Sequence, residues 1–163
     1  MNELSTLTSY LSFKLGDETF AANVSKVLNI LEMTKITKVP KAPEYMKGVI
    51  NLRGTVLPLV DTRIKFGLTP TEFTANTCIL VLDIQIENDT LQVGALVDAV
   101  QEVLEIEPYQ ILPPPNIGSK FHSQFIVGMY KATEEQFIMI LDMDKVFSTE
   151  ELLEVHESSQ GTQ

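Results

Sequence analysis

Short runs of alternating apolar and polar residues, separated by turn residues, constrain the fold of this chain more than any other feature. Residues 10–15 place apolar side chains at every second position, which is typical of a strand with one buried face. Gly16-Asp17 then predicts a tight turn, and residues 20–22 predict the returning strand. The chain should therefore begin with a β-hairpin.

The same pattern recurs further along the chain. Residues 77–86 and 91–97 predict a second hairpin across the polar turn 87–89, and residues 125–130 and 136–141 predict a third. The first two hairpins are each followed by apolar residues three positions apart, which indicates a structural duplication. We therefore expect a mainly β protein that contains two similar small units.

The middle of the chain predicts further strands. Residues 46–61 are mostly apolar and are interrupted at Arg53-Gly54, which predicts a strand, a tight turn and a strand. Pro58 has no N–H to donate to a sheet, so it should lie at an edge or a bulge. Residues 36–39 predict a short strand, and the Thr- and Pro-containing residues 66–76 predict the linker between the units.

A short helix is predicted where apolar residues recur at positions i, i+3, i+4 and i+7, namely Val24, Val27, Leu28 and Leu31. Ile30 would project beyond this stripe toward solvent. It would be either a peripheral core residue or part of an apolar groove that is open to a partner. The corresponding apolar residues of the duplicated half would line the facing unit: Val97, Val100 and Val103.

The C-terminal residues predict one more helix. Ser148 and Glu151 fit the two positions of a capping box, which predicts a helix over residues 149–157. Residues 158–163 contain nothing apolar and are predicted to be a disordered tail.

The composition excludes several classes of protein. Cys78 is the only cysteine, so an intramolecular disulfide or a thiolate metal cage cannot form, and a cytoplasmic location is expected. A signal peptide and a membrane-spanning segment are not evident. The net charge is −10, and residues 77–163 carry fifteen acidic against three basic residues, which disfavours binding to nucleic acid.

Catalytic, metal and cofactor sites are not expected. His122 and His156 are the only histidines, and neither has a partner at metal-ligand spacing. The chain also has no nucleophile elbow, phosphate-binding glycine loop or dinucleotide fingerprint. Four carboxylates could converge as an acid–base pair, but we interpret them as the positions where strands reach solvent: Asp61, Asp83, Asp98 and Asp142.

Arg53 is predicted to lie at the tip of a hairpin whose arms are buried. Such an arginine is either simply solvated or, because it is always charged and carries several donors, an interface residue on a rigid support. Gly48 and Gly54 are expected to adopt backbone conformations that a side chain would not permit.

This hairpin also carries a family signature. Residues 48–61, followed by Arg63 and Phe66-Gly67, resemble the signature of the bacterial chemotaxis coupling protein family, CheW. Further similarity lies at residues 13–18, 93–100, 103–104, Gly128 and 140–146. The resemblance covers residues 9–148 as a single domain.

The resemblance implies two five-stranded barrels, similar to Src homology 3 domains, that lie side by side. They would span roughly residues 9–67 and 77–147, with strands exchanged in some arrangement. It also implies a non-catalytic scaffold with two partners, the regulatory domain of a CheA-type histidine kinase and the helical hairpin tip of methyl-accepting chemotaxis receptors. The receptor tip would dock in the groove between the barrels, in arrays at the inner face of the membrane.

The resemblance assigns site residues by their positions. The receptor-binding positions are Val27, Ile30, Arg53, Val97 and Val100. The kinase-binding positions are Ile36, Val39, Tyr45, Gly48 and Gly54. Asn29 departs from the family, because many members carry glutamate there, and a charge-assisted contact would be lost or replaced by a neutral one.

Two other functions stay open from the sequence. A related adaptor could serve a kinase pathway of surface motility or gene regulation, using the same contacts with a different receptor. A small-barrel protein that binds single-stranded nucleic acid would need exposed aromatic residues on a basic face. The acidic second half and the absence of tryptophan disfavour that function.

Overall fold

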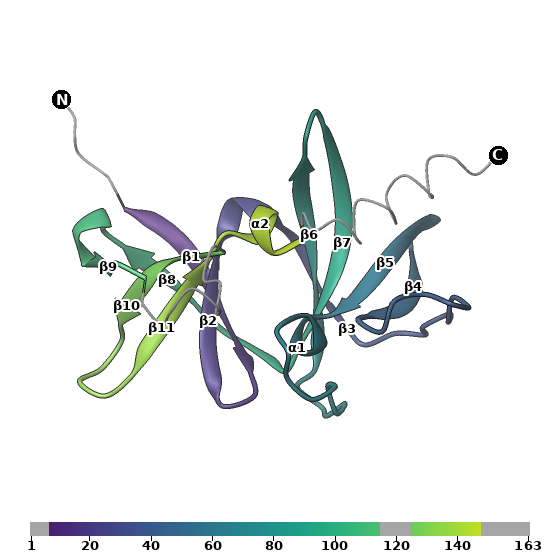
Figure 1. Cartoon of the computed structure of the whole chain (residues 1–163), viewed down its shortest axis with the longest axis horizontal. Helices are drawn as coiled ribbons and strands as arrows, with labels where there is room; N and C mark the ends of the chain where they lie inside the picture. Colours follow the sequence, from purple (N-terminus) through teal and green to yellow (C-terminus); the bar gives the residue numbers. More distant parts are fainter. Residues whose placement is uncertain (1–6, 115–124, 148–163) are drawn as a thin grey trace.

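Two curved β-sheets lie beside each other in the computed structural model, which describes residues 7–114 and 125–147 (Figure 1). In chain order, the elements are β1 Thr8–Leu15, β2 Glu18–Asn23, η1 Val24–Lys26, β3 Val27–Glu32, β4 Met46–Leu52, β5 Thr55–Asp61, α1 Thr62–Lys65, β6 Cys78–Ile86, β7 Asp89–Val97, β8 Ala99–Ile106, η2 Pro108–Gln110, β9 Ile111–Leu112, β10 Ile126–Lys131, β11 Phe137–Leu141 and α2 Met143–Phe147.

The strands are divided between the sheets in an order that does not follow the two halves of the sequence. Sheet A has the order β8-β1-β2-β11-β10-β9, and sheet B has the order β3-β6-β7-β5-β4. The predicted mainly β fold with two units is confirmed. Within the described residues sheet A has six strands rather than five, because the two-residue strand β9 adds to its edge.

Local sequence explains the hairpins. The β1–β2 turn uses Gly16, whose φ is 64°, and the β6–β7 ladder runs without interruption from Cys78↔Val97 to Ile86↔Asp89. At the tip of the β4–β5 hairpin, Arg53 and Gly54 have φ values of 53° and 86°, as a two-residue type I′ turn requires. All of the predicted hairpins are therefore confirmed.

The predicted helix over residues 24–31 is wrong. Val24–Lys26 form a single 3₁₀ turn, and Val27–Glu32 form β3, an edge strand that pairs with β6 from Val27↔Leu82 to Glu32↔Cys78. In a strand, successive side chains point to opposite faces, so Leu28 and Ile30 share the outer face. The helical spacing gave a wrong prediction because the pairing with β6, about fifty residues later in the chain, is not visible in the local sequence.

Two other local predictions need correction. Residues 36–39 form no strand, and only an isolated bridge joins Thr37 to Val49, with N–O distances of 2.9 and 2.8 Å. Residues 66–76 do not link the two units, because they connect α1 to β6 and both neighbouring strands belong to sheet B. Pro58 lies in an internal strand rather than at an edge, opposite Val49, and the register shift of the β4–β5 pair lies nearby, between Met46 and Gly48. β7 pairs with β5 only from Leu59 onward, so on that side the missing N–H costs no ladder bond.

Two apolar cores hold the sheets. The larger, which we call the inter-sheet core, contains buried residues from both sheets and from α2, among them Phe13, Leu15, Phe20, Leu80, Leu82, Val97 and Phe147. A smaller core within sheet B contains Ile50, Leu57, Leu59, Ile79, Val81 and Leu96. Because β6 sends alternate side chains into each core, its sequence is apolar at nearly every position.

Some predictions fall outside the described residues, namely the helix over 149–157, the tail over 158–163, and both histidines, His122 and His156. Within residues 7–114 and 125–147, none of the helices has the length and apolar character needed to span a bilayer.

Candidate functional site

An apolar groove lies between the two sheets where their edge strands, β3 and β8, approach each other. Its volume is about 370 Å³, and it is lined by Leu11, Val24, Val27, Leu28, Asn29, Ile30 and Val103. The side chains of Leu28, Ile30 and Val103 are 50%, 46% and 53% exposed. Three large apolar residues in one hollow form a surface that water solvates poorly, which is typical of a protein-binding site.

The edge position of both strands explains this exposure. Among residues 7–114 and 125–147, β3 pairs only with β6 and β8 pairs only with β1, so neither has a described strand on its other side. Alternation along β3 directs Leu28 and Ile30 outward, while Val27 packs against the inter-sheet core. In β8, Val103 lies opposite Leu11 of β1, which forms part of the groove floor.

The groove gathers only some of the predicted receptor-binding residues. Val27 and Ile30 line it, whereas Val100 lies in the neighbouring hollow between the same strands, with Glu32 and Met33. Val97 is 0% exposed and belongs to the inter-sheet core, so it has no surface to offer a partner. Arg53 lies at the β4–β5 turn and does not line the groove.

Sequence reasoning placed Val24 and Leu28 on the buried stripe of a helix, yet both line the groove. Leu28 is the more exposed of the two, at 50% against 37%. Strand alternation over Val27–Glu32 could have indicated its exposure. Asn29 also lines the groove, and its Oδ1 accepts a hydrogen bond from the backbone N–H of Ile30 at 2.8 Å. A neutral amide therefore stands at this position of the groove.

A second exposed surface, which we call the hairpin surface, consists of Arg53, Gly54 and Val56 at the β4–β5 turn. The side chain of Val56 is 69% exposed, and Arg53 and Gly54 are exposed at the turn. Val39 is 40% exposed but lies away from this surface, because the antiparallel bridge between Thr37 and Val49 directs it toward the Met46 end of β4. The backbone N–H of Gly54 donates to Oδ1 of Asn51 at 2.8 Å, which stabilises the turn. Arg53 is therefore held on a rigid support near the exposed side chain of Val56.

Three other predicted kinase-binding residues lie beside or just before β4 rather than at its turn. Gly48 has a φ of 146°, and a Cβ there would collide with the carbonyl oxygen of Thr37. Ile36 is half-buried against the sheet-B core, and Tyr45 is buried, with its carbonyl accepting from the N–H of Asp61 at 2.7 Å. These residues stabilise the β4–β5 hairpin away from its turn and offer a partner little side-chain area.

The four carboxylates do not form an acid–base pair. Asp61 is fully buried, contrary to the expectation that it reaches solvent, and accepts hydrogen bonds from the N–H and hydroxyl of Thr71 and the N–H of Arg63. Asp98 accepts from other donors, Asp142 accepts from the N–H of Lys145, and Asp83 lies within β6. Asp61 and Asp98 both accept from Arg63, through its backbone N–H and its guanidinium, so these two carboxylates are held by donors rather than by each other.

Other reactive groups give no sign of catalysis. Burial raises the pKa of the Cys78 thiol, with a backbone hydrogen bond from Val100 acting in the opposite direction, so the thiol stays protonated. In the part of the chain that the structure describes, His, Cys, Asp and Glu side chains form no group of three that could hold a metal ion.

Comparison with known proteins identifies the family. The profile of the CheW-like domain matches residues 9–151, which is most of the chain. This chain belongs to the CheW-like family. The chemotaxis protein CheW of Rhizobium meliloti is 38% identical over 141 residues, covering 86% of this chain and 88% of the relative. That of Klebsiella aerogenes is 32% identical, covering 88% and 83%.

The fold agrees with the family. The crystal structure of the scaffolding protein TtCheW from Thermoanaerobacter tengcongensis matches with a TM-score of 0.78 and 27% identity, over 93% of this chain and 94% of that one. The protein is therefore a chemotaxis scaffold of the CheW family and not an enzyme.

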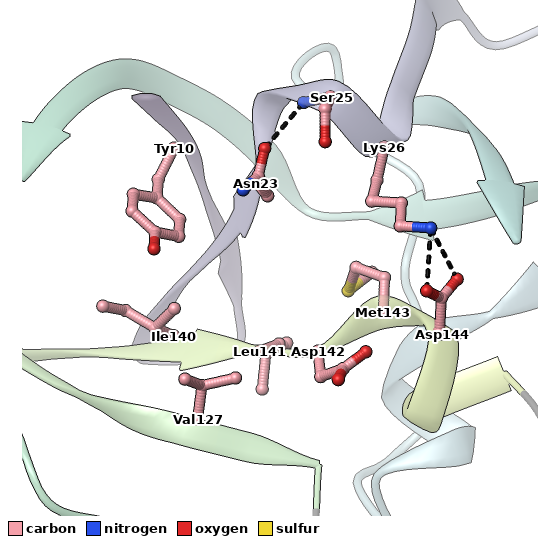
Figure 2. Close-up of a pocket in the computed structure, with 10 residues that line it drawn as sticks. All are labelled: Tyr10, Asn23, Ser25, Lys26, Val127, Ile140, Leu141, Asp142, Met143 and Asp144. Atoms are coloured by element: carbon pink, nitrogen blue, oxygen red, sulfur yellow. Dashed lines mark hydrogen bonds and ion pairs between the residues drawn. The ribbon is translucent and has the colours of Figure 1, made fainter. Parts of the chain in front are cut away.

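One further hollow in this CheW-family protein, of about 250 Å³, is lined by both polar and apolar residues (Figure 2). Its charged and amide groups contact each other or nearby backbone. Figure 2 shows the Lys26 ammonium directed at Asp144, and Oδ1 of Asn23 accepting from the N–H of Ser25 at 2.9 Å. Burial raises the pKa of Tyr10, so its hydroxyl keeps its proton. The pocket contains structural bonds and no catalytic arrangement.

Proposed function

We propose that this CheW-family protein couples a CheA-type histidine kinase to methyl-accepting chemotaxis receptors, in arrays at the inner face of the membrane. The observation that carries the proposal is the apolar groove between β3 and β8. It is an open hollow lined by exposed aliphatic side chains in a protein whose relatives are named chemotaxis proteins. Those names favour chemotaxis over another kinase pathway.

The groove suits a helical receptor tip. An amphipathic helix binds a hydrophobic groove by inserting apolar residues that recur every three or four positions. Leu28 and Ile30 from one wall and Val103 from the other would contact such a helix. Their burial would supply the affinity, and neutral Asn29 would meet a polar rather than a basic group of the receptor.

The kinase regulatory domain would bind the hairpin surface. Val56 supplies exposed apolar area, and Arg53 supplies a charged group with several donors on a rigid turn. Because Arg53 lies on this surface and not in the groove, we assign it to assembly of the ternary complex. The two surfaces are separate, so one molecule could hold both partners at once.

The substitution Ile30→Asp tests the groove. It should weaken binding of a receptor tip fragment by about 2–4 kcal/mol, the range of a central interface residue. The fold should survive, because Ile30 is 46% exposed and a carboxylate there stays solvated. Titration by isothermal calorimetry measures the affinity, and circular dichroism measures the fold.

Leu68→Asp is the matched control for this experiment. It places the same charge on a side chain that is 42% exposed but does not line the groove, so receptor binding should not change. Equal receptor affinities for the Ile30→Asp variant and the unmodified chain would exclude the groove as the receptor site.

A further inference from the structure

Asp98 joins the two sheets at the single residue where the chain passes from β7 in sheet B to β8 in sheet A. Its Oδ2 accepts from the N–H of Gly16, in the β1–β2 turn of sheet A, at 2.6 Å. The same oxygen accepts from Nη1 of Arg63, in α1 after β5 of sheet B, at 2.8 Å. Nε and Nη2 of Arg63 donate to the carbonyl and hydroxyl of Thr69, each at 2.8 Å. All three guanidinium nitrogens are thus engaged.

Asp144 makes a second connection of the same kind. It lies in α2, which follows β11 of sheet A, and its Oδ1 accepts from the N–H of Gln85 in β6 of sheet B at 2.8 Å. Its Oδ2 lies 2.7 Å from Nζ of Lys26, at the end of η1, where the chain passes from β2 in sheet A to β3 in sheet B (Figure 2). One carboxylate therefore bridges both sheets again.

The two connections stand where the walls of the groove begin. β3 starts at Val27, directly after Lys26, and β8 starts at Ala99, directly after Asp98. The strands run past each other so that Val103 shares a hollow with Val27 and Ile30, while Val100 shares one with Glu32 and Met33. A charged connection is therefore present at the start of each of the two strands that border these hollows.

We propose that the Arg63–Asp98 and Lys26–Asp144 connections position the two sheets relative to each other and thereby set the width of the apolar groove. The inter-sheet core holds the sheets together, but burial of apolar surface has no preferred direction. Charge-assisted hydrogen bonds are short and directional, so they fix the angle at which the sheets meet. The consequence for receptor binding rests on the proposed function, whereas the positioning itself does not.

Distances between two spin labels test the positioning without any partner. Labels on Asn88→Cys, at the β6–β7 turn, and on Tyr109→Cys, which is 81% exposed in η2, report on sheet B and sheet A in a Cys78→Ala background. The double variant Lys26→Met with Arg63→Met should allow the two sheets to move relative to each other. Double electron–electron resonance should then give a distance distribution about twofold broader than that of the labelled chain with both connections intact. An unchanged width would overturn the proposal.

Lys131→Met is the matched control. It also removes a lysine from an ion pair, but Lys131 and its partner Glu134 lie in one hairpin, so the width should not change. Equal broadening in this control would overturn the proposal. If the double variant does not fold by circular dichroism, the single variants Lys26→Met and Arg63→Met are measured separately. Each should broaden the distance distribution, and unchanged widths in both would overturn the proposal.

Binding by unlabelled chains that retain Cys78 separates this inference from the proposed function. The double variant should bind a receptor tip fragment about tenfold more weakly and the kinase regulatory domain unchanged, because the hairpin surface lies within sheet B alone. A broader distance distribution with unchanged receptor binding would support the positioning role of the connections and contradict the groove as the receptor site. Weaker receptor binding without a broader distribution would contradict that positioning role.

Discussion

Val97 and Val103 are the same residue type, six positions apart, yet they have opposite environments. Val97 is 0% exposed in the inter-sheet core, whereas Val103 is 53% exposed in the apolar groove. Val97 ends β7, which pairs on both sides within sheet B, while Val103 lies in β8 at the edge of sheet A. The comparison shows that position within a sheet, rather than hydrophobicity, decides whether an apolar residue stabilises the fold or remains available to a partner.

The largest difference in stability is expected when Val97 and Val103 are each replaced by aspartate. Val97→Asp should unfold the protein, because a buried carboxylate without a cation costs about 3–5 kcal/mol. Val103→Asp should change the free energy of unfolding by less than about 0.5 kcal/mol, since its carboxylate stays in water. Urea denaturation measures both. Similar losses for the two variants would show that the groove is closed in solution.

The two glycines of the β4–β5 hairpin allow a similar comparison within sheet B, between a crowded position and an open one. Gly48→Ala should cost about 2 kcal/mol, because the new methyl group collides with the Thr37 backbone at a φ of 146°. Gly54→Ala should cost about 1 kcal/mol, since its φ of 86° is unfavourable but its surroundings are open. Thermal unfolding compares them, and a larger loss for Gly54→Ala would contradict the supporting role of Gly48.

The smallest change in stability is expected at the hairpin tip, where one substitution should raise stability and reduce function. Arg53 has a φ of 53°, where asparagine is favoured in a type I′ turn. Arg53→Asn should therefore stabilise the protein by about 0.5 kcal/mol, a gain typical of improved turn chemistry. The same variant should impair kinase stimulation in reconstituted arrays. Full stimulation would show that the charge of Arg53 has no part in assembly.

Local sequence predicted much of the fold. Turn residues and strand alternation gave the hairpins at Gly16, Arg53-Gly54 and residues 87–89, because these signals depend on neighbours in the chain. The segment 24–31 failed for the opposite reason. It is apolar at most positions, so helical and strand spacing both fit, and its pairing with β6 decides between them.

The candidate site was predictable only in part. The sequence placed Ile30 toward solvent and Arg53 at a turn, and the structure agrees on both positions. It could not show that Val97 is buried or that Leu28 is exposed, because each depends on which strand covers it. The contacts of these residues with receptor and kinase remain predictions.

The sequence by itself determined the hairpins, their turns and the strand β6, whose apolar side chains fill two cores. Tertiary structure alone decided which strands share a sheet and left β3 and β8 as the bordering edges. The physical reason is range: backbone preference and side-chain alternation act between neighbouring residues, whereas burial depends on segments that meet only after the chain has folded.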